Sequence, residues 1–227
     1  KERKNYDVVF IHMNHKYAVL GGLFWKLWNK KIYLWYVHKK VNFMLKLAEK
    51  FVEKIFTASK ESFRLGSDKV VITGHGIDTK KFSKKNKNGK FVIITAGRIA
   101  PSKNIHLLID TAEILKEKKF DFEIRIAGAP VLKRDKIYFE KLKNDIAEKN
   151  LGSLIVFAGA IPNKNIAEFY REGNLFVNFS DTGSIDKAVL EAMAAGLLIL
   201  TSNEAFRPIL DKKYLTTKDP GEIAGKI

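Results

Sequence analysis

Two kinds of apolar segment alternate along the chain. The first kind is a short, continuous run of apolar and often β-branched residues. Runs of this kind are typical of strands that are buried on both faces of a parallel sheet, because neither side of such a strand meets water. The sequence predicts strands of this type at residues 8–11, 32–35, 70–72, 91–94, 122–126, 154–157, 175–179 and 197–200.

The second kind has apolar residues three or four positions apart, which is the spacing of one helix face. Such segments lie between the predicted strands of the second half. The alternation predicts an α/β fold with a parallel sheet and crossover helices. The apolar faces are formed by Leu108, Ala112 and Leu115, by Phe139, Leu142 and Ile146, by Ile166, Phe169 and Tyr170, and by Ile185, Ala188, Val189 and Ala192.

One stretch interrupts this alternation. The sequence Gly74-His75-Gly76 follows a predicted strand, and residues 80–90 are rich in lysine and poor in apolar side chains. We interpret this stretch as a linker. It divides the chain into residues 1–77 and 78–227, each with its own βα units. Paired α/β domains often hold a ligand near the carboxyl ends of their strands.

Composition narrows the class of protein. The 227 residues are 46% hydrophobic and 29% charged, as in a folded globular protein. The absence of cysteine excludes disulfides, thiolate metal sites and cysteine nucleophiles. The longest apolar stretch, residues 18–28, contains Lys26 and is shorter than the roughly 20 residues that a membrane span needs. No signal-peptide pattern opens the chain, and we expect both ends to be cut from a longer protein.

Positive charge is concentrated in the first part of the chain. Residues 1–90 hold 21 lysine and arginine residues against seven acidic ones, whereas residues 91–227 hold 20 against 18. This predicts an anionic partner: a membrane, a nucleic acid or a phosphorylated acceptor. The alternative is a general preference for lysine over arginine. The aromatic stretch at residues 17–28 also has two interpretations: its side chains are either part of the hydrophobic core or an anchor at a membrane interface.

The loop after the predicted strand at residues 91–94 is the first candidate site. Gly97 frees the backbone where the strand ends, and Arg98 and Lys103 follow before the next helix. Arginine offers a planar fork of donors and lysine a point charge, and both suit phosphate oxygens. Open α/β sheets bind ligands at this end of their strands. The alternative is a pair of surface cations on an ordinary loop.

The segment after the predicted strand at residues 175–179 is the second candidate site. A polar turn there leads into a helix that we expect to start near Ser184. Helix amino termini present free N–H groups that suit a diphosphate. Glu191 lies within the most apolar helix, and its carboxylate can only accept hydrogen bonds, so the vicinal diol of a ribose is a natural ligand. The alternative is a capped helix with a solvated glutamate.

Other signals are weaker. Gly128 ends a predicted strand and would let a nucleotide approach the backbone. His38 follows the strand at residues 32–35 and could orient a reacting hydroxyl. His12 and His15 have a spacing that suits a metal, but no third ligand accompanies them, so no metal site is predicted.

Together these segments resemble the retaining glycosyltransferases of group 1, also called family four, over nearly the whole chain. The resemblance implies the GT-B fold, with two Rossmann-like parallel-sheet domains facing a cleft. Residues 1–77 would be a truncated N-terminal, acceptor-side domain, and residues 78–227 the C-terminal donor-binding domain without its closing helices. The matching stretches are His75-Gly76-Ile77-Asp78 with Phe82, Gly97-Arg98 with Lys103, Ala158-Gly159, and Leu190 to Gly196.

The resemblance also implies residue roles. Arg98 and Lys103 would bind the donor diphosphate and replace the metal ion that other transferases use, so no cofactor is expected. His38 would lie near the transferred sugar, and Gly128 would allow the nucleotide to approach. The segment Gly76-Ile77-Asp78 would form the interdomain hinge.

A further set of residues would bind the donor in the turn and helix at residues 181–191. The resemblance implies that Glu191 holds the ribose hydroxyls and that Gly183 and Ser184 offer backbone N–H groups. The family usually carries a second glutamate eight positions before Glu191, and here that position is Gly183. Asp181 or Asp186 could substitute for it.

We therefore expect a retaining, metal-independent glycosyltransferase. It would move a hexose from a UDP- or GDP-sugar to a hydroxyl of a glycan or lipid-linked acceptor, in cell-envelope glycan biosynthesis. The expected location is the cytoplasm, with a peripheral contact at an anionic inner membrane face. No nucleic-acid partner is expected, because no binding motif accompanies the basic composition. The alternatives are a catalytically silent nucleotide-sugar-binding protein, a nucleic-acid-binding protein, and another GT-B-type enzyme such as an epimerase or phosphorylase.

Overall fold

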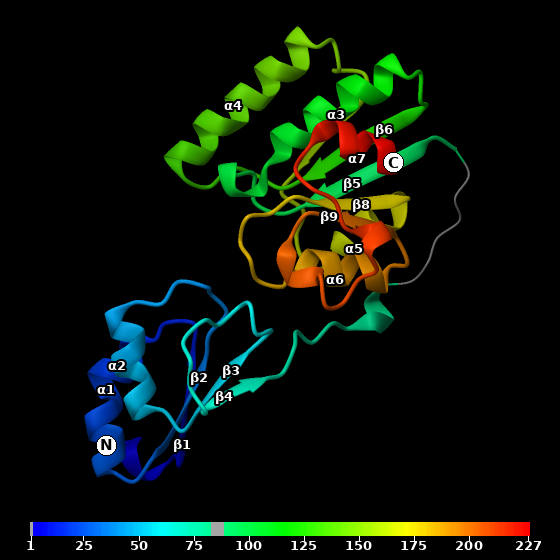
Figure 1. Ribbon diagram of the computed structural model, residues 1–227. Helices are drawn as coiled ribbons and strands as arrows, with labels where there is room; N and C mark the ends of the chain where they lie inside the picture. The colour runs from blue at the N-terminus through cyan, green and yellow to red at the C-terminus, as the bar shows by residue number, and fades with distance from the viewer. Residues whose placement is uncertain (1, 83–88) are drawn as a thin grey trace. The chain divides into compact units, whose positions relative to one another are not determined.

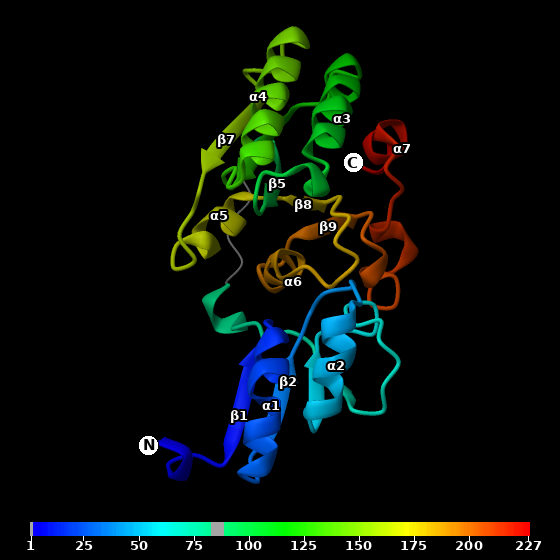
Figure 2. The same cartoon turned by 90° about the vertical axis from the view of Figure 1, so that its left-hand side faces the viewer.

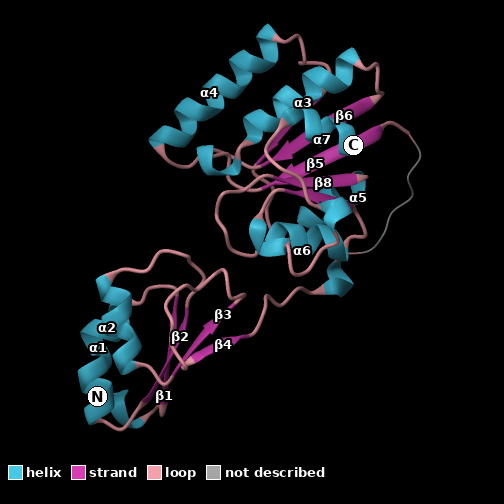
Figure 3. Cartoon of the chain, viewed as in Figure 1, coloured by secondary structure: helices cyan, strands magenta, loops and turns pink. Residues whose placement is uncertain are grey.

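The computed structural model describes residues 2–82 and 89–227. Its internal contacts form two compact units: unit 1 comprises Lys1–Gly76 and Gly183–Ile185, and unit 2 comprises Ile77–Thr182 and Asp186–Ile227. Each unit is built on one parallel sheet with its own apolar core (Figure 1; Figure 3). None of the described helices is long and apolar enough to cross a lipid bilayer.

Unit 1 has a four-stranded sheet in the order β1-β2-β3-β4, with every neighbouring pair parallel. Its two helices lie on one face of the sheet (Figure 1; Figure 2). The elements are β1 (Val8–His12), α1 (Lys16–Leu27), β2 (Lys31–Trp35), α2 (Phe43–Phe51), β3 (Lys54–Thr57) and β4 (Val70–Ile72).

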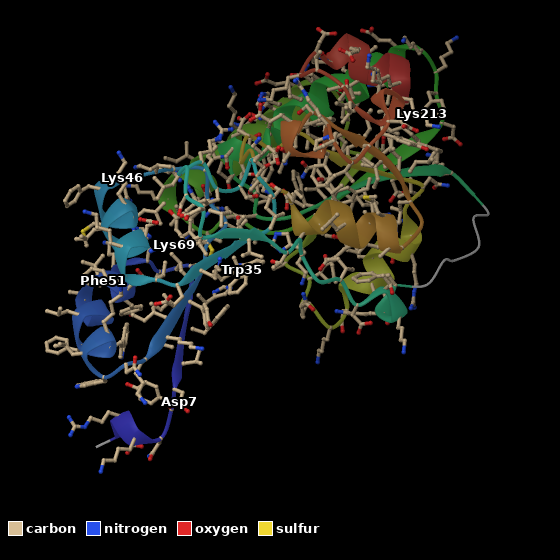
Figure 4. The ribbon with its side chains drawn as sticks, turned by 60° about the horizontal axis from the view of Figure 1, so that its bottom comes forward. Asp7, Trp35, Lys46, Phe51, Lys69 and Lys213 are labelled. Carbon is tan, nitrogen blue, oxygen red and sulfur yellow. The ribbon has the colours of Figure 1, made fainter. Side chains whose placement is uncertain are left out.

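The two helices of unit 1 pack closely because one of them has a glycine at the contact. A Cβ on Gly22 would lie 2.5 Å from Cγ of Phe51, so no larger residue fits against that ring (Figure 4). Lys69, in the segment before β4, forms a hydrogen bond to α2, in which its Nζ donates to the Glu49 carbonyl at 2.8 Å (Figure 4). The expectation that all strands are buried on both faces is wrong for β1, where Val8 and Phe10 are exposed, because both helices cover the same face.

Unit 2 has a five-stranded parallel sheet in the order β7-β6-β5-β8-β9. Helices α3, α4 and α7 cover one face, and α5 and α6 cover the other (Figure 1; Figure 2). The strands are β5 (Phe91–Ala96), β6 (Phe122–Ala127), β7 (Ile155–Gly159), β8 (Leu175–Asn178) and β9 (Leu198–Thr201), and the helices are α3 (Ile105–Glu117), α4 (Lys133–Glu148), α5 (Ile166–Glu172), α6 (Lys187–Ala194) and α7 (Pro220–Lys226).

The strand order of unit 2 creates a switch point at β5. The chain proceeds from β5 to β6 and β7 on one side, and then returns to place β8 and β9 on the other. The connections on the two sides of β5 therefore diverge at the carboxyl ends of the strands, where ligands bind in folds of this type. Fully buried side chains on the strands, such as Ile93, Ile124 and Phe176, pack in the core and fix the position of this edge.

All eight predicted strands are present, and the predicted α/β class is confirmed. Strand β3 was not predicted, because Lys54-Ile55-Phe56-Thr57 contains only two apolar residues. The expected start of a helix near Ser184 is wrong, since α6 begins at Lys187. Asp186 has an extended backbone, with φ −84° and ψ 119°, and forms the N-cap, so the helix begins only after it.

Part of the predicted linker is folded. Thr79–Lys81 forms a 3-10 turn in unit 2, and the ring of Phe82 that follows is only 7% exposed. Lys81 holds this turn on the loop after β7, donating to the carbonyl and, at 2.9 Å, to the Oδ1 of Asn163. The aromatic ring of Phe82 provided apolar surface to bury, which the interpretation as a linker overlooked. Residues 83–88 of the predicted linker lie outside the described residues.

The loops after β5 and β6 touch through their backbones. Gly97 donates to the Ala127 carbonyl at 2.9 Å, and Gly128 donates to the Gly159 carbonyl at 2.7 Å. A Cβ on Gly128 would lie 1.8 Å from the Gly97 carbonyl oxygen, and Gly128 has a φ of +142°. Both the contact and the conformation require glycine.

We predict that Gly128→Ala lowers the free energy of unfolding of unit 2 by about 3 kcal/mol, because the new methyl group meets backbone atoms that cannot move aside. Thermal unfolding followed by far-ultraviolet circular dichroism measures the loss. Gly152→Ala is the matched control, because a Cβ there has no heavy atom within 4 Å and the backbone is not left-handed. Equal melting temperatures for the two variants would contradict the prediction.

Candidate functional site

A cleft of about 380 Å³ opens at the carboxyl edge of the unit 2 sheet. Small residues after β5, β6 and β7 form its floor, because the glycine contacts described above bring the three loops together. Helices α5 and α6 supply the remaining wall. The residues that line it are Ala96, Gly97, Arg98, Ala127, Gly128, Ala129, Val131, Ala160, Ile161, Ile166, Tyr170, Ala188 and Glu191.

Arg98 is the cationic side chain of this cleft. Its side chain is 43% exposed, and its Nε lies 3.7 Å from Oδ2 of Asp135. Asp135 is fully buried at the start of α4, where Oδ2 also accepts a hydrogen bond from the Leu132 N–H at 3.1 Å. A buried carboxylate therefore orients the guanidinium while part of the guanidinium stays accessible to a ligand.

Lys103 lies at the end of a 3-10 turn, Pro101–Lys103, and its Nζ is 2.5 Å from Oδ2 of Asp186. The same oxygen accepts a hydrogen bond from Asn178 Nδ2 at 3.1 Å. Lys103 and Asn178 line a small hollow between β5 and β8, next to the main cleft, and Arg98 borders both cavities. Asp186 therefore pairs with a phosphate-binding candidate. From the sequence, Asp186 was expected only as a substitute for the missing glutamate.

Glu191 extends from α6 into the wall of the cleft and is 8% exposed. Its Oε2 accepts a hydrogen bond from the Tyr170 hydroxyl at 3.2 Å, and its Oε1 lies 3.6 Å from Lys187 Nζ. The expectation that a carboxylate in this apolar helix has to find donors is confirmed. Tyr170 was expected only as one residue of an apolar helix face, so the role of its hydroxyl as a donor to Glu191 was not predicted.

Three candidate residues of the turn before α6 line neither the cleft nor the hollow beside it. Asp181, Gly183 and Ser184 lie in the connection between β8 and α6. Asp181 accepts a hydrogen bond from Asn104 Nδ2 at 2.9 Å and pairs with Lys218. The structure thus brings together Arg98, Lys103, Gly128 and Glu191 but not these three, whose predicted roles in donor binding stay predictions.

The remaining candidate, His38, belongs to unit 1. It is exposed in the loop after β2, where its Nδ1 accepts a hydrogen bond from the Lys40 N–H at 3.0 Å. His15 is buried edge-on against Tyr36, with ring centroids 5.3 Å apart, and burial lowers the pKa of the His15 imidazole. Across the described part of the chain, no three histidine or acidic side chains gather as metal ligands would.

Comparison with known proteins extends this picture. Residues 76–210 match the model of the family "Glycosyl transferases group 1". The chain is 26% identical over 133 residues to the mannosylfructose-phosphate synthase of Agrobacterium fabrum, covering 57% of this chain and 29% of that protein. It is 28% identical over 153 residues to the amylovoran biosynthesis glycosyltransferase AmsK of Erwinia amylovora, covering 63% and 36% respectively. The chain thus spans about a third of the length of these relatives.

Among solved structures, the chain is similar to Anabaena HepE, crystallised in complex with UDP and glucose. The TM-score is 0.83 at 17% identity, over 97% of this chain and 67% of that one. This likeness confirms the predicted GT-B class of fold. The family model covers more than half of the chain, and its matched range includes Arg98, Lys103, Gly128 and Glu191. The chain therefore belongs to the group 1 glycosyl transferases.

Proposed function

We propose that the protein transfers a hexose from a UDP- or GDP-sugar to a hydroxyl of a glycan or lipid-linked acceptor, with retention of the anomeric configuration. The observation that carries this proposal is the unit 2 cleft, where an accessible guanidinium and a buried carboxylate line one cavity at the switch point of the sheet. A nucleoside diphosphate has the matching groups, an anionic diphosphate and a vicinal diol.

In this proposal, each polar group of the site has one task. Arg98 and Lys103 bind the diphosphate, and Glu191 accepts hydrogen bonds from the ribose hydroxyls. Gly128 adds no side chain to the floor, which leaves room for the nucleotide. The relatives' names support a glycosyltransferase, and HepE was crystallised with UDP and glucose.

The proposed chemistry follows from the charges. As the bond between sugar and diphosphate breaks, positive charge develops on the sugar and negative charge on the leaving diphosphate. Arg98 and Lys103 stabilise that negative charge, and their fixed positions reduce the reorganisation needed in the transition state. Glu191 is the one carboxylate among the described residues that line the cleft, and it is engaged with the ribose. We therefore propose attack by the acceptor on the face from which the diphosphate leaves, without a covalent intermediate.

The binding step gives the first test of this proposal. We predict that the chain binds UDP or GDP and that Glu191→Gln weakens this binding about tenfold, because a charge-assisted hydrogen bond to the ribose is lost. Affinity for pyrophosphate stays unchanged in that variant. Arg98→Ala weakens the binding of both ligands. Isothermal titration calorimetry measures all three affinities.

The control for the glutamate substitution is Glu148→Gln, which makes the same change at an exposed position on α4. Circular dichroism verifies the fold of each variant, which matters for Arg98→Ala because that substitution removes the guanidinium 3.7 Å from the buried Asp135 and leaves Arg134, at 3.8 Å, as the other cation near it. Wild-type affinity of Glu191→Gln for the nucleotide would contradict a ribose contact. Absence of binding by the wild-type chain to either nucleotide would contradict the proposed donor site.

Metal independence is part of the same proposal, since two cationic side chains supply the positive charge at the diphosphate. We predict that sugar transfer by the intact protein persists at its full rate in excess EDTA. The release of UDP or GDP from the corresponding sugar nucleotide measures the rate. Complete loss of activity that magnesium or manganese restores would contradict the prediction.

A catalytically silent nucleotide-sugar-binding protein is the second candidate function. The observation that favours it is Gly183, which occupies the place of the second glutamate that the family usually carries. A screen of UDP- and GDP-sugars with the intact protein separates the two functions. Thermal stabilisation by a sugar nucleotide without transfer or hydrolysis would support the silent binder, whereas transfer to an acceptor would exclude it.

We also propose that unit 1 makes a peripheral contact with an anionic membrane at the cytoplasmic face. Helix α1 has no acidic residue, and Lys16 and Lys26 lie within it. Five of its large apolar side chains are more than half exposed: Tyr17, Leu20, Leu23, Phe24 and Leu27. Basic and apolar groups on one helix are the combination that binds at lipid interfaces.

We predict that the chain cosediments with phosphatidylglycerol vesicles at low ionic strength and that the bound fraction falls steeply as the salt concentration rises. The reason is that attraction between exposed charges more than about 10 Å apart is largely screened at 0.1 M salt. Phosphatidylcholine vesicles, which carry no net charge, are the control and should retain little protein. Two outcomes would remove the proposal: no binding at low salt, or binding that salt does not change.

A further inference from the structure

The hydroxyl of Tyr170 is the neutral donor at the Glu191 carboxylate. Tyr170 is fully buried on α5, and its hydroxyl oxygen lies 3.2 Å from Glu191 Oε2 on α6. Both helices lie on the same face of the unit 2 sheet (Figure 1; Figure 2). The other carboxylate oxygen, Oε1, faces Lys187 at 3.6 Å, and the lysine side chain is 53% exposed. One oxygen of Glu191 is thus held from inside the protein, while the other lies toward a cation at the surface.

The Tyr170 hydroxyl has two acceptors within reach, Glu191 Oε2 and the carbonyl of Ala188, each at 3.2 Å. Both acceptors belong to α6 and line the same cleft. Burial and the neighbouring Glu191 carboxylate raise the pKa of Tyr170, so its hydroxyl keeps its proton and stays a donor. A hydrogen bond to a carboxylate is stronger than one to a neutral carbonyl, so Glu191 is the favoured acceptor.

The ring of Tyr170 is fixed by aromatic neighbours. Phe82 packs edge-on against it with centroids 5.8 Å apart, and Phe176 of β8 lies at 5.7 Å. Phe82 is itself held by the preceding turn, because Lys81 is anchored on Asn163 in the loop after β7. The hydroxyl position therefore depends on packing and has little rotational freedom.

We propose that Tyr170 is a positioning residue that fixes the Glu191 carboxylate in the orientation that accepts the ribose hydroxyls. Without it, Glu191 would be a nearly buried carboxylate whose remaining described partner is the half-exposed Lys187, and its side chain would be free to turn away from the cleft. This role rests on the proposed function, since it presumes that Glu191 binds a ribose. It also gives the stretch that ends at Phe82 a task inside unit 2, as the support of the tyrosine ring.

The test uses Tyr170→Phe, which removes the hydroxyl and keeps the ring that Phe82 and Phe176 contact. Calorimetry compares whichever of UDP and GDP the chain binds more tightly with its 2′,3′-dideoxy analogue, which lacks both ribose hydroxyls. We expect the wild-type chain to prefer the ribonucleotide. In Tyr170→Phe, affinity for the ribonucleotide falls about tenfold, while affinity for the dideoxynucleotide changes by less than about twofold.

Tyr138→Phe is the matched control, because it also removes a partly buried hydroxyl. The Tyr138 hydroxyl is hydrogen-bonded to His106 at 3.0 Å, between α3 and α4. Tyr138 is not among the residues that line the cleft, so both affinities should stay at wild-type values in this variant. Both variants can have a lower melting temperature. If the preference for the ribonucleotide is lost only in Tyr170→Phe, the effect is due to positioning and not to a general loss of stability.

The contrary outcomes are distinct. Ribose preference that persists in Tyr170→Phe would overturn the positioning role and leave the proposed function intact. Equal losses for the two nucleotides in Tyr170→Phe would assign the hydroxyl a structural role only, and would also overturn the proposal. A wild-type chain without ribose preference would overturn the ribose contact itself, and the positioning role with it.

Discussion

The site of unit 2 depends on the close contact between two backbones, at Gly97 and Gly128. Their loops follow adjacent strands, and the Gly97 carbonyl occupies the space that a side chain on Gly128 would need. This contact keeps the floor of the cleft free of side chains and fixes the start of the loop that carries Arg98. The sheet positions the two loops, and the cavity remains open because Gly97 and Gly128 have no Cβ atoms.

The charged groups of the site are arranged in pairs within the protein. Arg98 faces the buried Asp135, and Lys103 faces Asp186, so each cation is oriented by a carboxylate of its own unit. Such pairing lowers the net charge of the cavity but reduces the number of positions that each cation samples. Glu191 is the reverse case, an anion oriented by a neutral hydroxyl. Under the proposed function, a ligand with a diphosphate at one end and a diol at the other would meet groups that are already in place.

The strands and the class of fold could be predicted from the sequence, because short apolar runs that are rich in β-branched residues and bounded by polar turns favour strands, whereas helices need longer segments. Arg98 and Gly128 could be predicted as site residues because each follows a strand, at the edge of the sheet where ligands bind. Glu191 could be predicted because a carboxylate in an apolar helix needs hydrogen-bond donors. The contacts of Asp186 with Lys103 and of Tyr170 with Glu191 could not be predicted. The partners are distant in sequence, and only the packing of β5, α5 and α6 brings them together. The start of α6 differs from the expected one because the extended backbone of Asp186 leaves no mark in the pattern of apolar residues.

The division into two units with separate cores has a consequence for spectroscopy. All three tryptophans, Trp25, Trp28 and Trp35, belong to unit 1, whereas the cleft of unit 2 is lined by a tyrosine and by residues that do not fluoresce. Tryptophan emission therefore reports the melting of unit 1. A nucleotide held by unit 2 stabilises that unit by mass action and raises its transition selectively. A single melting temperature taken from fluorescence would describe the half of the molecule that does not hold the cleft, and a two-state analysis of the whole chain would merge two separate transitions.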